Sequence, residues 1–115
     1  LRRDGPSCLA LSRQNLAPQP RSGEQIANIA RGGYVLFEAG NETDLILLAT
    51  GSEVGIAVEA ARALAAQGRG VRVVSMPCCE VFDAQSQSYR DQVLPPQARR
   101  RVAIEAAVGD YWRKY

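Results

Sequence analysis

The sequence predicts an α/β fold with three layers: a mixed, mostly parallel sheet covered by helices on both faces. Three observations predict it. Short apolar runs end at glycine, serine or proline, an amphipathic helical pattern separates two of them, and strand and helix patterns alternate along the chain. Strands joined through helices require crossover connections, which make neighbouring strands parallel. Two closely spaced runs after residue 32 indicate one antiparallel edge strand.

The first half of this alternation has the clearest signals. Residues 34–38 (YVLFE) follow Gly32-Gly33 and predict a strand, and the continuous apolar run 44–49 is typical of a strand buried on both faces. Ser52 is a suitable N-cap for the next helix, and Glu53 suits the positive end of its dipole. Apolar residues then recur at spacings of three and four until about Gly68.

The second half continues the alternation with weaker signals. Residues 71–76 (VRVVSM) predict a strand that ends at Pro77, and residues 82–94 a weaker helix or helical turn that ends before two prolines. Residues 101–106 (RVAIEA) predict a further strand, and residues 110–115 the start of a helix. Because the chain ends about one turn into that helix, we expect the fold to be truncated.

The N-terminal part differs in composition. Residues 7–11 (SCLAL) read as a short strand, and residues 17–23 contain two prolines that exclude both a helix interior and a central strand. We therefore predict three parts: residues 1–16 as the last strand of a domain whose body is absent, residues 17–31 as a linker, and residues 32–115 as an incomplete α/β domain.

Composition narrows the function classes. A net charge of +2, without aromatic residues between the short arginine runs, does not indicate a nucleic-acid partner. The longest apolar run is far shorter than the ~20 residues that a membrane helix needs, and no secretory signal is present. Three cysteines, two of them adjacent, and no histidine indicate a reduced, cytoplasmic protein without a zinc site.

Two segments are candidates for binding an anion. Thr50-Gly51-Ser52-Glu53 lies between a strand and a helix, where backbone amides favour negative charge, although a plain tight turn is the more common reading. Arg13 follows the carboxyl end of the predicted strand 7–11, and its planar guanidinium could hold a phosphate. From spacing alone, a surface salt bridge of Arg13 is as good an interpretation.

Other chemically active residues have simpler interpretations. The carboxylates Glu38 and Glu42, or Asp83 and Asp91, could form acid/base pairs, but solvated carboxylates are the favoured interpretation. Cys78-Cys79 has no histidine nearby to activate a thiol. The aromatic group at the C-terminus is more typical of a core or a subunit interface than of a cofactor site; it consists of Tyr111, Trp112 and Tyr115.

Several segments together resemble the transketolase family. Residues 11–16 (LSRQNL) resemble a transketolase motif, and further blocks follow in the family's order: IARGGYVL, LLATGSEV, VRVVSMP and RVAIEA with a following Tyr-Trp, within residues 29–36, 47–54, 71–77 and 101–112. The resemblance covers about residues 5–115. Cys78-Cys79-Glu80 departs from it, because small polar residues are more common there.

The resemblance implies a function for the whole parent protein. Transketolases are homodimers of three-domain chains that transfer a two-carbon ketol unit between sugar phosphates in the pentose phosphate pathway, using thiamine diphosphate and a divalent metal, Mg²⁺ or Ca²⁺. On this basis residues 1–16 end the pyrimidine-binding domain and 32–115 begin the C-terminal domain. Arg13 inherits the sugar-phosphate contact. The catalytic, cofactor and metal residues of the family belong to earlier sequence, so we expect this chain alone to be inactive and to bind no cofactor.

Two alternatives remain open at the level of sequence. One is a free-standing α/β module that binds a phosphate or nucleotide without chemistry. The other is a sister enzyme such as dihydroxyacetone synthase, which has the same domain arrangement and a different acceptor.

Overall fold

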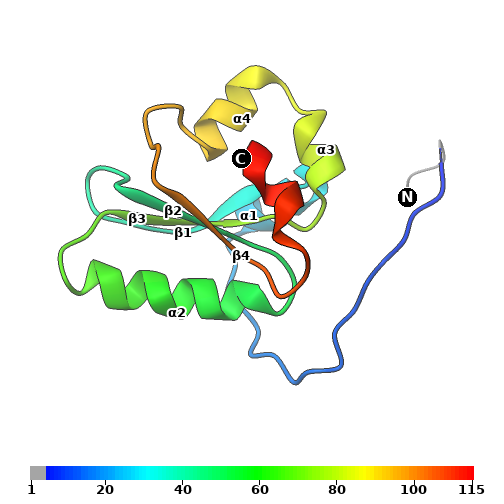
Figure 1. Cartoon of the computed structure of the whole chain (residues 1–115), viewed down its shortest axis with the longest axis horizontal. Helices are drawn as coiled ribbons and strands as arrows, with labels where there is room; N and C mark the ends of the chain where they lie inside the picture. The colour runs from blue at the N-terminus through cyan, green and yellow to red at the C-terminus, as the bar shows by residue number, and fades with distance from the viewer. Residues whose placement is uncertain (1–4) are drawn as a thin grey trace.

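A four-stranded sheet in the order β1-β3-β2-β4 organises the chain (Figure 1). The structure is a computed structural model, and it describes residues 5–115. The strands and helices, in chain order, are α1 (Gly23–Asn28), the 3₁₀ helix η1 (Ile29–Arg31), β1 (Tyr34–Ala39), β2 (Leu45–Ala49), α2 (Glu53–Ala65), β3 (Val71–Ser75), α3 (Cys79–Asp83), α4 (Gln87–Val93), β4 (Arg101–Ile104) and the 3₁₀ helix η2 (Gly109–Lys114).

The sheet is mostly parallel, as predicted. β2 is parallel to both β3 and β4, with Ala49 opposite Ser75 and Ile104 at the strand ends. β1 is antiparallel to β3 and forms one edge, with Tyr34 opposite Ser75. The prediction of one antiparallel edge strand is therefore confirmed, although this strand pairs with β3 and not with its neighbour in sequence, β2.

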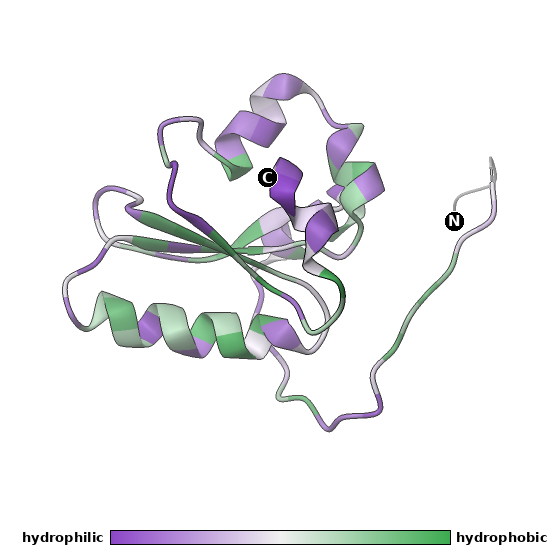
Figure 2. Cartoon of the chain, viewed as in Figure 1, coloured by the Kyte–Doolittle hydropathy of each residue, from purple (hydrophilic) through white to green (hydrophobic). Residues whose placement is uncertain are grey.

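Helices cover both faces of the sheet, which confirms the three-layer α/β prediction (Figure 1). On one face, α2 buries an apolar stripe against β1, β2 and β3; the stripe consists of Val54, Ala57, Val58 and Ala61. On the other face, α3, α4 and η2 enclose a second core around Phe82, Tyr89 and Trp112. Figure 2 shows the apolar strands between these layers. Burial of these two sets of side chains is the main driving force for the fold.

The start of α2 differs from the prediction in one respect. Ser52 occupies the N-cap position but does not cap the helix with its side chain. Its Oγ donates instead to the carboxylate of Glu53, at 3.0 Å from both oxygens. Ser52 has helical backbone angles, φ −64° and ψ −30°, whereas a capping serine normally has an extended backbone.

The helix or helical turn predicted for residues 82–94 is interrupted in the structure. Two short helices, α3 and α4, replace it, and Ser86 separates them. The Oγ of Ser86 accepts a hydrogen bond from the amide of Tyr89 at 3.3 Å and so starts α4 as a new helix. The last predicted strand ends earlier, at Ile104, and the C-terminal helix is a 3₁₀ helix, η2.

The prediction of a strand at residues 7–11 stays a prediction, because the domain whose sheet it would complete is not part of this chain. Residues 5–21 form an extended segment without regular secondary structure (Figure 1). A strand exists only when a neighbour satisfies its backbone groups, and no described strand lies in register with this segment. Within the range predicted as a linker, residues 23–28 form α1, whose capping box pairs Ser22 with Gln25.

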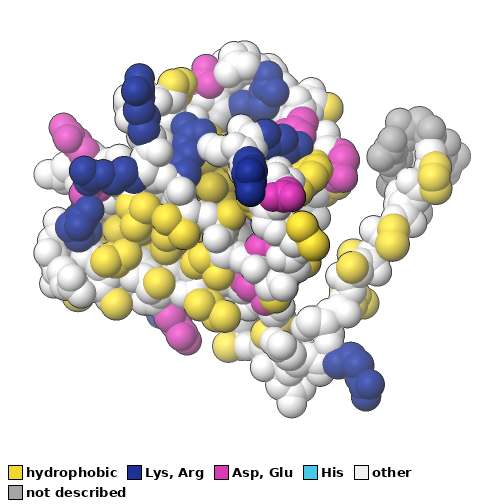
Figure 3. Space-filling view, viewed as in Figure 1, with side chains coloured by type: hydrophobic (Ala, Val, Ile, Leu, Met, Phe, Trp, Pro, Cys, Tyr) yellow, Lys and Arg dark blue, Asp and Glu magenta, His cyan; other side chains and the backbone are white. Residues whose placement is uncertain are grey.

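β4 forms the second edge of the sheet and is largely exposed. Val102 is 49% exposed, and hydrophobic side chains gather over β4 and α2 on the face shown in Figure 3. Among the described residues, no helix is long and apolar enough to cross a membrane.

Candidate functional site

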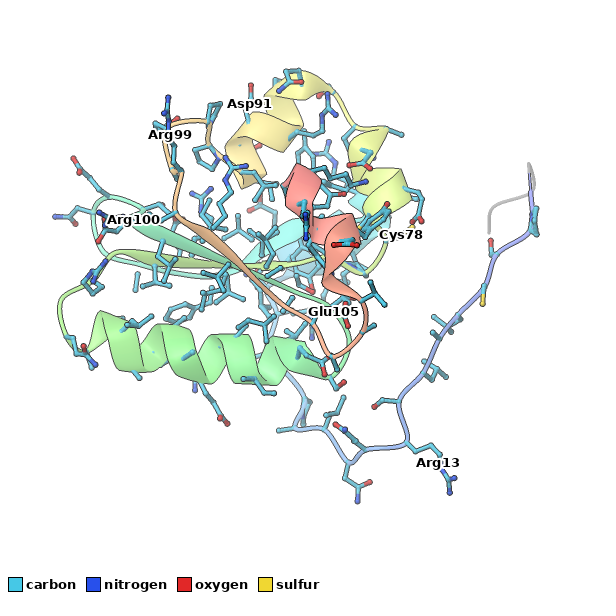
Figure 4. The ribbon with its side chains drawn as sticks, in the orientation of Figure 1. Arg13, Cys78, Asp91, Arg99, Arg100 and Glu105 are labelled. Carbon is cyan, nitrogen blue, oxygen red and sulfur yellow. The ribbon has the colours of Figure 1, made fainter. Side chains whose placement is uncertain are left out.

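Arg13 lies on the extended N-terminal segment, outside the α/β domain. Its side chain is exposed and points away from the domain in Figure 4. The Arg13 side chain forms no hydrogen bond or ion pair with another described residue. The structure therefore does not place it in contact with any other candidate residue. Its predicted role in phosphate binding therefore stays a prediction.

The segment that follows Arg13 is fixed to β1 by two long side chains. Arg21 donates from Nε to the hydroxyl of Tyr34 at 2.7 Å and from Nη1 to the carbonyl of Gln19 at 2.8 Å. Gln25 donates from Nε2 to the carbonyls of Val35 and Leu36, at 3.0 and 2.8 Å. These contacts hold residues 19–25 against the open edge of the sheet.

A groove of about 560 Å³ forms where this segment passes the carboxyl ends of the strands. Its walls come from residues 14–19, from the first turn of α2, and from the end of β3. Its polar lining includes the side chains of Arg21, Tyr34, Glu59 and Ser75. Gln14 and Asn15 of the LSRQNL motif line the groove, whereas Arg13 does not.

The predicted anion-binding turn, Thr50-Gly51-Ser52-Glu53, forms one wall of the groove through Gly51 and Ser52. Gly51 has a positive φ of 54°, which a glycine adopts without strain and which allows β2 to turn directly into α2. Because Ser52 bonds Glu53, the amides of Val54 and Gly55 have no hydrogen-bond acceptor among the described residues. The turn therefore presents free donors to the groove.

Of the four carboxylates that could have formed acid/base pairs, Glu38 and Asp83 form ion pairs with basic side chains instead. Glu38 accepts two hydrogen bonds from Arg72, and Asp83 accepts from Lys114 and from the hydroxyl of Tyr115. Burial raises the pKa of Asp83, but the hydrogen bonds from Lys114 and Tyr115 outweigh it and lower the pKa below its usual value. These carboxylates are structural.

The cysteines form no disulfide in the described part of the chain. Cys78 lies 3.5 Å from a carboxylate oxygen of Glu80, and burial raises the pKa of the Cys79 thiol above its usual value. A raised pKa keeps Cys79 as the unreactive thiol at neutral pH. Across residues 5–115, no group of three His, Cys, Asp or Glu residues could hold a metal ion.

The C-terminal aromatic residues belong mainly to the core, as favoured above. Trp112 is buried, and Tyr115 packs between the rings of Phe82 and Trp112, with centroids at 6.1 Å from each. Tyr111 is exposed, and its ring faces the ammonium group of Lys114 at 4.0 Å.

Sequence reasoning missed three residues with clear roles. Arg101, the first residue of β4, donates to four backbone carbonyls, those of Leu94, Pro95, Ala98 and Tyr115. Arg21 and Ser75 were also missed, because neither belongs to a motif that indicates a binding or catalytic residue. Only the position of Ser75 at the end of a buried strand could have drawn attention to it, since ligands of α/β sheets bind there.

Comparison with known proteins identifies the family. Residues 32–115 match the family described as the transketolase-like TK C-terminal domain. The chain belongs to the transketolase family. Transketolase 1 of Vibrio vulnificus strain YJ016 is 57% identical over 114 residues, and transketolase 2 of Escherichia coli K12 is 54% identical over 114 residues. Each comparison covers 99% of this chain and 17% of the relative.

Solved transketolases share the fold as well as the sequence. Transketolase from Leishmania mexicana superposes with a TM-score of 0.78 and 45% identity, covering 90% of this chain and 15% of that one. A transketolase structure from Pichia stipitis gives a TM-score of 0.68 and 39% identity over 78% of this chain and 13% of that one. The chain therefore spans a small part, about a sixth, of the length of the transketolases that it matches.

Proposed function

We propose that this chain acts as part of a transketolase that transfers a two-carbon ketol unit from ketose phosphates to aldose phosphates. The observation that carries the proposal is the 57% identity to a transketolase over 114 residues, which include both the LSRQNL motif and the α/β domain. In this role residues 1–16 end the pyrimidine-binding domain, residues 17–31 connect it, and residues 32–115 form the C-terminal domain.

Sugar phosphates are the proposed substrates. The Pichia stipitis neighbour is a complex with sedoheptulose 7-phosphate, and related structures of the same enzyme contain fructose 6-phosphate or xylulose 5-phosphate. Each of these ligands is a sugar that carries a phosphate at one end. A phosphate distant from the reacting carbonyl serves as a handle, because binding it orients the carbonyl without taking part in the reaction.

Arg13 is the residue proposed to hold that phosphate. A guanidinium presents paired donors that match two phosphate oxygens, and such charge-assisted bonds are about twice as strong as neutral ones. The exposed side chain is not committed to a described neighbour, so it is free to meet a substrate supplied by the rest of the enzyme.

Thiamine diphosphate and a divalent metal, Mg²⁺ or Ca²⁺, are the proposed cofactors of the parent enzyme, where thiamine diphosphate supplies carbanion stabilisation. Among the described residues, no group of three His, Cys, Asp or Glu residues could hold a metal ion, and the residues that bind both cofactors are proposed to lie elsewhere in the parent enzyme. A homodimer in the cytoplasm is the corresponding proposal for assembly and location.

The test is Arg13→Ala in the intact transketolase that carries this sequence. We expect KM for phosphorylated sugars to rise about ten- to a hundredfold, the loss of one charge-assisted contact of about 1.5–3 kcal/mol. KM for an unphosphorylated ketose should change less than about twofold.

Arg99→Ala is the matched control, because Arg99 is an exposed arginine on the α/β domain and lies away from the motif (Figure 4). It should leave both KM values unchanged. Equal losses on phosphorylated and unphosphorylated substrates in the Arg13 variant would contradict the phosphate role.

A further inference from the structure

We propose that the groove at the carboxyl ends of β2 and β3 binds the phosphate group of a small molecule. Its ligands would be the hydroxyls of Ser75 and Tyr34 and the free amides at the start of α2. This site does not use Arg13, and so it stands independently of the function proposed above.

The position of the groove in the topology favours ligand binding. After β2 the chain turns into α2 on one face of the sheet, and after the adjacent strand β3 it turns into α3 and α4 on the other face (Figure 1). Two neighbouring parallel strands whose connections leave in opposite directions open a crevice between them. Gly51 and Ser52 after β2, with Ser75 and Pro77 at the end of β3, line this crevice.

Ser75 is the first observation that points to a ligand. It is only 5% exposed, yet it lines the groove, and its hydroxyl has no hydrogen-bond partner among residues 5–115. Side chains alternate along β3, so Ser75 lies on the same face as Val71 and Val73, which pack in the core beneath α2. Nε of Arg90 is the only fully enclosed polar side-chain atom without a partner among the described residues, so the Ser75 hydroxyl is open to the groove, where a ligand oxygen could accept its hydrogen bond.

Tyr34 adds a second buried side chain with a hydroxyl to the lining of the groove. It is the antiparallel cross-strand partner of Ser75, so the two side chains lie next to each other on one face. Tyr34 is 2% exposed, and its oxygen already accepts a hydrogen bond from Arg21. That contact leaves the phenolic hydrogen free to donate, and the positive charge of Arg21 makes the phenol a stronger donor.

The first turn of α2 supplies two further donors. The helix has 13 residues, its N-terminus carries partial positive charge, and the amides of Val54 and Gly55 in the groove wall have no acceptor among the described residues. Glu59 is the carboxylate on the rim, one to two turns further along α2, and it is exposed. Its charge weakens anion binding without blocking the donors.

The chemistry of the donors defines the ligand. Two hydroxyls, two amides and the Arg21 guanidinium all offer hydrogen atoms, so the matching ligand is rich in acceptors and negatively charged. A phosphate fits this set better than a carboxylate, since it offers more oxygens in three dimensions. The groove, at about 560 Å³, has room for a phosphate ester of a small metabolite.

The test is an amide-resolved NMR titration of the 115-residue chain with inorganic phosphate, at constant ionic strength set with KCl. We expect saturable shifts centred on Val54, Gly55 and Ser75. Acetate in place of phosphate should bind at least about fivefold more weakly, which separates a phosphate site from a carboxylate site.

Variants decide which groups bind. Ser75→Ala and Tyr34→Phe should each weaken phosphate binding about ten- to a hundredfold, the usual loss for one hydrogen bond to a charged group, and Glu59→Gln should strengthen it. Ser88→Ala, at an exposed serine of α4, and Arg13→Ala are the controls and should bind as the unaltered chain does.

Three results would overturn the proposal. The first is shifts that do not saturate or that KCl alone reproduces. The second is equal binding by the Ser75→Ala, Tyr34→Phe and unaltered chains. The third is loss of phosphate binding in the Arg13→Ala chain, which would show that the phosphate binds at Arg13 of the LSRQNL motif and not at Ser75 and Tyr34.

Discussion

Arg72 on β3 and Glu38 on β1 are cross-strand partners, and the guanidinium of Arg72 donates two hydrogen bonds to one carboxylate oxygen of Glu38, at 2.8 and 2.6 Å. The remaining arm of Arg72 donates to the carbonyls of Gln92 and Val93 at the end of α4, at 2.7 and 3.0 Å. The Arg72 side chain is 12% exposed. A single arginine therefore ties the antiparallel edge strand, the sheet and the helical layer together.

Arg72→Met should lower the free energy of unfolding by about 2 kcal/mol, because two carbonyls and one carboxylate lose a charged donor at a largely buried position. Glu38→Gln keeps the bonds from Arg72 to α4 and weakens only the exposed ion pair, so it should cost about 0.5 kcal/mol. Urea unfolding followed by circular dichroism measures both. Equal losses for the two variants would show that the contacts to α4 contribute nothing.

Arg101 and Arg100 offer a matched pair on adjacent positions. Arg101 donates to four backbone carbonyls that join α4, the following loop and η2, whereas Arg100 makes an ion pair with Asp44 while its side chain is 70% exposed. Arg101→Met should cost about 2–3 kcal/mol of stability, and Arg100→Met less than about 0.5 kcal/mol.

Thermal unfolding monitored by Trp112 fluorescence can compare these two variants. Trp112 is buried in the core between the sheet and the elements that Arg101 holds together. The Arg101 variant should show a much lower Tm, with the Arg100 variant close to the unaltered chain. A similar Tm for both variants would mean that the carbonyls find other donors when Arg101 is removed.

The sheet was predictable because its strands are buried on both faces. Residues 45–49 read as a continuous apolar run and residues 71–75 as three valines interrupted by Arg72, and in the structure they are the two central strands, β2 and β3. The stripe of α2 was equally plain, since its spacing of three and four needs only the local sequence. Both signals can be read from the sequence, because an apolar run and a helical periodicity each depend on only a few neighbouring residues.

The sequence is a weaker guide where distant contacts or single side chains decide the structure. Residues 7–11 have the composition of a strand but meet no partner among the described residues. Ser86 divides one predicted helix into two through a single hydrogen bond. In the candidate site, Tyr34 and Ser75 are 41 positions apart and meet only through the β1–β3 register, which no local pattern reveals.

Gly70 and Gly23 differ in the space around them, which gives a third prediction. The carbonyl of Gly70 accepts hydrogen bonds from the amides of Asp44 and Leu45, at 2.9 and 3.1 Å. A Cβ at position 70 would overlap the carbonyl oxygen of Glu42, whereas a Cβ at position 23 meets nothing within 4 Å. Close backbone approach is therefore the reason for glycine at position 70.

Gly70→Ala should destabilise the chain by about 2 kcal/mol or more, because the backbone of the loop before β2 must move to admit a methyl group. Gly23→Ala should be neutral or stabilise by up to about 1 kcal/mol, since alanine is the better helix former. Chemical denaturation of the two variants measures the difference. A neutral Gly70→Ala variant would show that this loop adjusts freely.

Asp83, Lys114 and Tyr115 form a cluster that makes stability depend on pH. The carboxylate of Asp83 accepts from the Lys114 ammonium group and, at 2.8 Å, from the Tyr115 hydroxyl. Burial raises the pKa of Asp83, but these donors outweigh it, and the folded-state pKa lies below the unfolded value. An acid with a lowered folded pKa stabilises the fold above its unfolded pKa, and that stability is lost as pH falls through the folded pKa.

Acidification below the usual pKa of an aspartate, about 4, should therefore weaken the unaltered chain more than Asp83→Asn, which lacks the titrating group. The expected difference is below about 1 kcal/mol, because both side chains are more than a third exposed to solvent and water screens the pair. Urea midpoints between neutral pH and pH of about 3 measure it. Asp91→Asn, which removes a carboxylate outside the cluster, is the control and should follow the unaltered chain. Parallel pH curves for Asp83→Asn and the unaltered chain would show that the contacts of Lys114 and Tyr115 do not bias the ionisation of Asp83, and that η2 is held to α3 by its aromatic packing alone.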